Sequence, residues 1–104
     1  MEIALPRFSQ PQVNLYVDDV EASVRFWVEH LGFRETFRTP ENGTPEHVEV
    51  RMEGLVLGFG SIETARRVHS LPIDITSQSG EVVLWTDYVD AAWERLLAVG
   101  ATPI

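Results

Sequence analysis

The chain has 104 residues, 44% hydrophobic and 23% charged, which is enough for one domain with a modest core. Sixteen acidic and eight basic residues give a formal net charge of −8, which repels phosphate backbones and anionic lipids and argues against nucleic-acid and membrane partners. The sequence has no cysteine, which excludes disulfides and thiolate ligands, and it has no membrane span or signal peptide, so we expect a cytoplasmic protein.

The first predicted element is a strand at residues 12–17, because apolar side chains alternate with others along it. Alternation with a period of two places one face of a strand against a core. The core face would carry Val13, Leu15 and Val17. The opposite face, which would line a concave sheet, would carry Gln12, Asn14 and Tyr16.

A helix is predicted next, over residues 20–31, from an apolar stripe at helical spacing that includes Trp27 as a core residue. Asp18 stands three residues before Glu21, which resembles a capping box and predicts Asp18 as the N-cap. Gly32 is expected to end the helix.

Three strands are predicted after this helix, at residues 33–39, 47–53 and 55–60, with Asn42-Gly43 in the loop between the first two. Alternation again assigns the faces. The side chains predicted to face away from the core are His47, Glu49 and Arg51, followed by Val56, Gly58 and Gly60.

Residues 1–60 therefore form a βαβββ module with an N-terminal extension, and residues 61–80 are predicted to be a linker with one short helical turn near residues 63–68. Residues 81–104 would begin a second module with a strand and a helix, after which the chain stops. The strand would turn Glu81 and Trp85 inward, Asp87 would cap the helix, and Trp93 would lie in the core.

An internal repeat supports the two modules. QVNLYVDDVEA at 12–22 aligns without gaps to EVVLWTDYVDA at 81–91, an offset of 69 residues. Tyr16 and Trp85 occupy equivalent positions in the two copies.

The run from Val17 to Phe33, VDDVEASVRFWVEHLGF, resembles the opening signature of the vicinal-oxygen-chelate superfamily, which contains glyoxalases, bleomycin resistance proteins and dioxygenases. The Phe26-Trp27 pair is similar to antibiotic-binding members of that family. The resemblance covers roughly residues 12–104. It implies an α+β fold of paired βαβββ modules, whose sheet curves into an open cup with helices on its convex face.

The same resemblance implies four metal-ligand positions on the concave face. They fall on Gln12, Glu81, Gly58 and a residue beyond Ile104. Glycine has no side chain to ligate a metal, and a catalytic divalent ion typically needs about three protein ligands. The visible set is therefore Gln12 and Glu81, which is incomplete for one divalent metal ion, and no other cofactor and no catalytic residue is indicated.

Each candidate residue also has a plain structural explanation. Gln12 and Glu81 could bind a ligand or be solvated strand ends. Tyr16 and Trp85 could stack on a planar molecule or fill space in the sheet. Asn14, His47, Glu49 and Arg51 could bind a ligand or form a solvated face of the sheet. Gly58 could leave room for a ligand or mark a local twist of the strand.

The leading functional hypothesis is a glyoxalase/bleomycin-resistance-like protein that binds a small aromatic or cationic molecule on the concave sheet without the full metal site. The alternatives are a metal-dependent lyase, isomerase or dioxygenase of the glyoxalase type, and a dimeric scaffold with no small-molecule role. A lone module would leave its strand edges exposed, so we expect a homodimer, with or without exchange of modules between chains.

Overall fold

The computed structural model describes residues 6–76 and 80–104 and divides the chain into two compact units, Met1–Ile73 and Asp74–Ile104. Parts of the predicted N-terminal extension and linker, at residues 1–5 and 77–79, lie outside the described residues. Among the described residues, no helix is long and apolar enough to cross a membrane.

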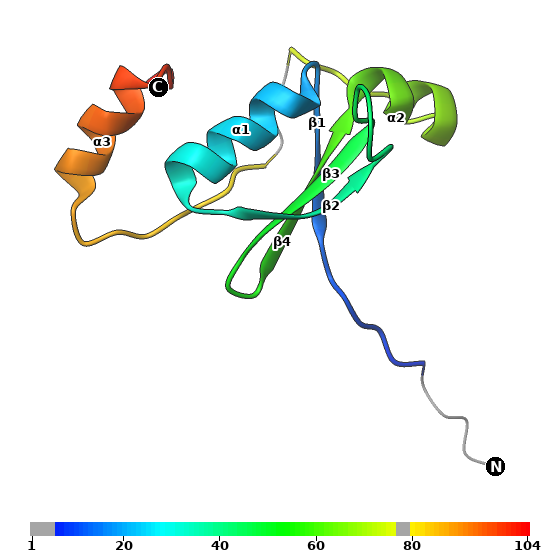
Figure 1. Ribbon diagram of the computed structural model, residues 1–104, viewed down its shortest axis with the longest axis horizontal. Helices are drawn as coiled ribbons and strands as arrows, with labels where there is room; N and C mark the ends of the chain where they lie inside the picture. The colour runs from blue at the N-terminus through cyan, green and yellow to red at the C-terminus, as the bar shows by residue number, and fades with distance from the viewer. Residues whose placement is uncertain (1–5, 77–79) are drawn as a thin grey trace. The chain divides into compact units, whose positions relative to one another are not determined.

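The first unit has the predicted βαβββ order, followed by one more helix (Figure 1). Its elements are β1 (Val13–Val17), α1 (Val20–Leu31), β2 (Arg34–Thr39), β3 (His47–Met52), β4 (Leu55–Ser61) and α2 (Ile62–His69). The strands form one mixed sheet in the order β1-β4-β3-β2, in which β1 runs parallel to β4 and the other pairs are antiparallel. The α+β prediction is confirmed.

The core lies between α1 and one face of the sheet. Val48 and Val50 of β3 are fully buried, and Leu57 and Phe59 of β4 are 1% exposed. The Trp27 ring of α1 lies 5.7 Å from the Phe59 ring, as expected for a core tryptophan. Val13 departs from the predicted core, since it begins the edge strand β1 and stays 51% exposed.

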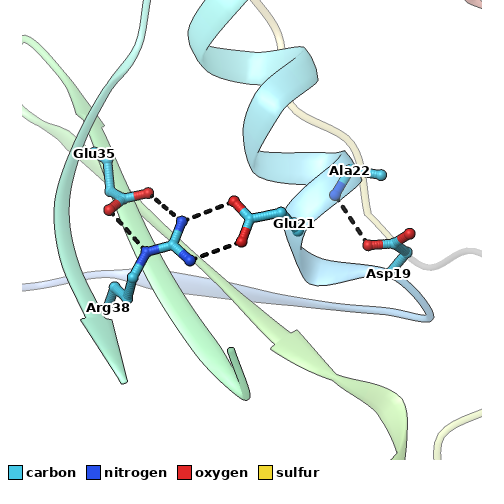
Figure 2. A network of polar contacts seen from close by, with 5 residues as sticks. All are labelled: Asp19, Glu21, Ala22, Glu35 and Arg38. Carbon is cyan, nitrogen blue, oxygen red and sulfur yellow. Dashed lines mark hydrogen bonds and ion pairs between the residues drawn. The ribbon is translucent and has the colours of Figure 1, made fainter. Parts of the chain in front are cut away.

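The N-cap of α1 is Asp19, so the prediction of Asp18 was wrong by one residue. The Asp19 carboxylate accepts a hydrogen bond from the backbone N–H of Ala22 at 3.0 Å (Figure 2). Asp19 takes this role because its extended backbone, with φ −120° and ψ 95°, aims the side chain at the first turn. The helix ends at Gly32, whose φ of 82° suits glycine.

Glu21 does not close a capping box but joins α1 to β2 through Arg38. The Arg38 guanidinium donates to both carboxylate oxygens of Glu21, at 2.7 and 2.8 Å, and also to Glu35 (Figure 2). These hydrogen bonds from Arg38 hold the pKa of Glu21 below its ordinary value, against an opposing effect of burial. Glu21 and then Glu35 raise the pKa of Arg38.

The residues predicted as a linker begin with an ordered helix. The expected short turn is the eight-residue helix α2, capped by the Ser61 hydroxyl, which accepts from the backbone N–H of Thr64 at 3.0 Å. Ile62 and Ala65 are buried, because α2 packs against β1 and β4. The first unit thus continues to Ile73.

The second unit contains helix α3 (Val89–Ala98), as predicted, but residues 81–85 are not in a strand. A strand needs a hydrogen-bonded neighbour, and the described residues of this unit provide none. The N-cap of α3 is Tyr88 rather than Asp87, and its side chain makes no capping bond. Trp93 is 54% exposed instead of buried, and no residue of α3 is buried.

Candidate functional site

The sheet face opposite α1 carries two rows of side chains that cross neighbouring strands. In the first row Asn14 of β1 and Glu49 of β3 flank Gly58 of β4. In the second row Tyr16 and His47 flank Gly60 in the same way. We call this surface the polar face, and it comprises Asn14, Tyr16, His47, Glu49, Gly58 and Gly60. Strand alternation predicted these orientations.

Gly58 lets side chains from β1 and β3 approach each other over β4. A Cβ atom at Gly58 would lie 2.2 Å from Asn14 Oδ1 and 2.6 Å from His47 Cε1. Both distances are far shorter than a van der Waals contact, so the space that a side chain would fill here is already occupied. At Gly60 a Cβ atom would lie 3.2 Å from the Tyr16 ring. The two glycines therefore let polar and aromatic groups lie flat on the sheet.

Hydrogen bonds order the polar side chains on this face. Gln12 donates from Nε2 to Asn14 Oδ1 at 2.9 Å. His47 Nε2 lies 3.0 Å from Glu49 Oε2, and the two side chains are 26% and 24% exposed. A half-buried imidazole paired with a carboxylate is a typical arrangement for a group that accepts or transfers a proton.

A hollow of about 240 Å³ opens beside these residues, between the polar face and α2. Four of its lining residues were predicted as site residues, namely Gln12, Asn14, Tyr16 and His47. The remaining lining residues are Glu46, Gly60, Ser61, Thr64, Ala65 and His69.

The contribution of α2 was missed by the sequence analysis. Ala65 and His69 are four residues apart, which places them on the same side of a helix. Ser61 and Glu63 mark the start of that helix, and this signal was available in the sequence. His69, which falls among the residues predicted as a linker, lines the hollow.

The lining of the hollow includes one carboxylate, that of Glu46, and no arginine or lysine side chain. The guanidinium of Arg67, which is not a lining residue, contacts Glu46 at 3.2 Å and is also bonded to Glu63 at 2.9 Å. Those carboxylates, Glu63 first, raise the pKa of Arg67. An anionic ligand would therefore meet no unpaired positive charge among these residues.

The other predicted site residues lie elsewhere. Arg51 pairs in register with Val56 and Arg34. It lies on the same sheet face as the polar face but does not line the hollow. Glu81 and Trp85 belong to the second unit, where both are exposed, Trp85 to 95%.

The metal set implied by the resemblance does not fit the residues of the first unit. Gln12 donates its amide to Asn14, and the position of Gly58 is covered by Asn14 and His47. Across the described part of the chain, no group of three or more His, Cys, Asp or Glu side chains could hold a metal ion. The donors present suit hydrogen bonding to an organic ligand better than ligation of a divalent metal.

Comparison with known proteins gives a family match over nearly the whole chain. Residues 9–104 match the family model described as the Glyoxalase/Bleomycin resistance protein/Dioxygenase superfamily. No curated protein matches the chain.

Solved structures with a similar fold include a glyoxalase/bleomycin resistance protein/dioxygenase from Nocardioides, with 25% identity, a TM-score of 0.62, and coverage of 94% of this chain and 66% of that chain. A glyoxalase-related enzyme from Fulvimarina pelagi shares 28% identity, with a TM-score of 0.59 and coverage of 89% and 66%. The lactoylglutathione lyase from Agrobacterium tumefaciens, at 19% identity, a TM-score of 0.59 and coverage of 90% and 72%, shows the fold alone. This chain thus spans about two thirds of the length of the first two proteins.

Proposed function

The chain belongs to the glyoxalase/bleomycin resistance protein/dioxygenase superfamily, and on that premise we propose that it binds a small organic molecule in the hollow beside the polar face. The observation that carries the proposal is the joint presence of an aromatic side chain, Tyr16, and ordered hydrogen-bonding groups around one hollow. Binding sites typically combine apolar walls with a few fixed polar groups.

The size of the hollow limits the ligand. Its volume of about 240 Å³ is below the roughly 300–1,000 Å³ of typical ligand pockets, so a small molecule or one end of a larger one would fit. Tyr16 offers a ring face for stacking and a hydroxyl for hydrogen bonding. These features support a non-catalytic binder of aromatic or cationic compounds.

The test is a ligand titration followed by NMR on the isotope-labelled chain. We expect saturable shifts at the amides of Tyr16, His47 and Gly60 with members of a panel of small aromatic and cationic compounds. Tyr16→Leu should weaken binding by up to about tenfold, the value of one aromatic contact. Tyr88→Leu is the matched control, since Tyr88 is 76% exposed in the second unit. Unsaturable shifts, or equal binding by both variants, would sink the proposal.

Elemental analysis separates this proposal from the metal-dependent enzyme. The proposal predicts no stoichiometric divalent ion in the purified protein or in Glu81→Ala. About one ion per chain, lost in Glu81→Ala, would replace the binder with a lyase, isomerase or dioxygenase that uses a metal as Lewis acid.

A further inference from the structure

We infer that His47, oriented by Glu49, selects the ligand of the hollow by accepting a hydrogen bond at Nδ1 from a hydroxyl or ammonium group. The inference rests on the proposed function, because it names the chemistry of the molecule that binds at the same site. It follows from the orientation of one imidazole ring and from the charges around it.

The Glu49 carboxylate determines which nitrogen of His47 carries the proton. A carboxylate only accepts hydrogen bonds, so the 3.0 Å contact requires the proton on Nε2 of His47. In a neutral imidazole the other nitrogen, Nδ1, is then an acceptor. Glu49 therefore makes Nδ1 a fixed acceptor rather than an alternating donor and acceptor.

Nδ1 of His47 lies near Gly60, one of the residues that line the hollow. A Cβ atom at Gly60 would lie 3.9 Å from this nitrogen, and both Gly60 and His47 line the hollow, whereas Glu49 does not. Among the described residues, Nδ1 has no hydrogen-bond partner in the protein. A ligand in the hollow can therefore supply the missing donor.

The surrounding charges favour the same class of ligand. Glu49 is hydrogen-bonded to His47, and Glu46, which lines the hollow, is already paired with Arg67. A carboxylate or phosphate on the ligand would face the lone pair of Nδ1 close to the Glu49 carboxylate, and the lining has no lysine or arginine to attract it. A neutral alcohol or an ammonium group meets no such penalty and can donate to Nδ1.

Three probes that share one ring test this selection on the full 104-residue chain. Benzylamine, benzyl alcohol and benzoate differ only in the group attached to the ring, so Tyr16 contributes equally to each. At about pH 8, above the range in which imidazoles ordinarily titrate, NMR titrations should give dissociation constants at least about fivefold lower for benzylamine and benzyl alcohol than for benzoate.

Glu49→Gln removes the carboxylate that fixes the ring, because an amide can both donate and accept. Binding of benzylamine and benzyl alcohol should weaken about fivefold. The loss for benzyl alcohol matters most, since a pure change of charge would leave a neutral probe unaffected. Nitrogen-15 spectra of the histidine side chains should show Nε2–H alone for His47 in the native chain and a mixture of tautomers in Glu49→Gln. The control Glu53→Gln removes the same charge in the β3–β4 turn and should change neither result.

The outcomes separate this inference from the proposed function. Benzoate binding as tightly as benzylamine, or a preference unchanged in Glu49→Gln, would overturn the role of His47 while leaving the hollow as a binding site. Failure of all three probes and of the wider panel would overturn both.

Discussion

At the scale of single residues, the candidate site depends on a glycine, Gly58, at a position where a side chain would fill the space between Asn14 and His47. The resemblance places a metal ligand at residue 58, but this chain has glycine there. Asn14 and His47 fill the space that a longer side chain would take. At this position of β4, a glycine covered by Asn14 and His47 thus stands where the resemblance places a metal ligand.

Gly58→Ala should disturb this surface without unfolding the protein. The added methyl group would displace the ends of two flexible side chains, Asn14 and His47, rather than backbone atoms. We expect a melting temperature within about 5 °C of the native value and benzylamine binding weakened about tenfold, measured by calorimetry and NMR titration.

Gly54→Ala is the matched control, because a Cβ atom there would meet nothing within 4 Å. It should leave both quantities unchanged. Unaltered binding in Gly58→Ala would show that the approach of Asn14 and His47 over β4 has no part in ligand binding.

At the scale of elements, the start of α1 depends on which of two adjacent carboxylates caps it. Asp19→Ala should lower the free energy of unfolding by about 1 kcal/mol, because the backbone N–H of Ala22 loses its acceptor. Asp18→Ala should change it by less than about 0.5 kcal/mol. Chemical denaturation of both variants measures the difference, and equal losses would contradict the assignment of the cap.

The contact between α1 and β2 predicts a pH dependence of stability. Arg38 lowers the pKa of Glu21 from its ordinary 4.5, so the stabilisation is fully present above pH 4.5 and is lost as the pH falls through the lowered pKa. Glu21→Gln should therefore lower the melting temperature at neutral pH by only about 2–4 °C, since a partly exposed pair is screened by solvent.

Thermal unfolding of the native chain and Glu21→Gln across acidic pH checks the sign. The two melting curves should converge as the pH falls below 4.5. Glu29→Gln, an exposed substitution on the same helix, should show no such convergence. A difference that grows on acidification would contradict the lowered pKa.

At the scale of the whole molecule, the second unit exposes apolar side chains in a segment whose sequence repeats that of β1. Residues 81–91 repeat residues 12–22, whose strand β1 is paired with β4. In the second copy, Val83 is 61% exposed and Trp85 is 95% exposed. Exposed apolar surface of this kind usually marks an interface.

We expect a second copy of this chain to cover that surface, because the repeated segment has the sequence of a strand and β1 is an edge strand of the sheet that the described residues form. Sedimentation velocity should detect a dimer that dissociates on dilution. Trp85→Ser should weaken it by at least about tenfold, whereas Val68→Ser, a 56% exposed position on α2, should not. A monomer at every concentration would contradict the prediction.

The sequence by itself determined the βαβββ order of the first unit and the sheet face that each strand residue occupies. Local patterns suffice for this, because alternation in a strand and spacing in a helix follow directly from backbone geometry. Helix α1 was predicted with its observed bounds, Val20–Leu31, from its apolar stripe and Gly32. The polar orientation of Asn14, Tyr16, His47 and Glu49 came from the same rule.

Only the tertiary structure decided which of these residues meet. The approach of Asn14 and His47 over Gly58 depends on the order β1-β4-β3 in the sheet, and the lining by α2 depends on how that helix packs after β4. The choice of Asp19 over Asp18 depends on backbone angles. Such contacts join residues far apart in the chain or turn on a single dihedral angle, so no local pattern encodes them, whereas packing of the whole sheet determines them.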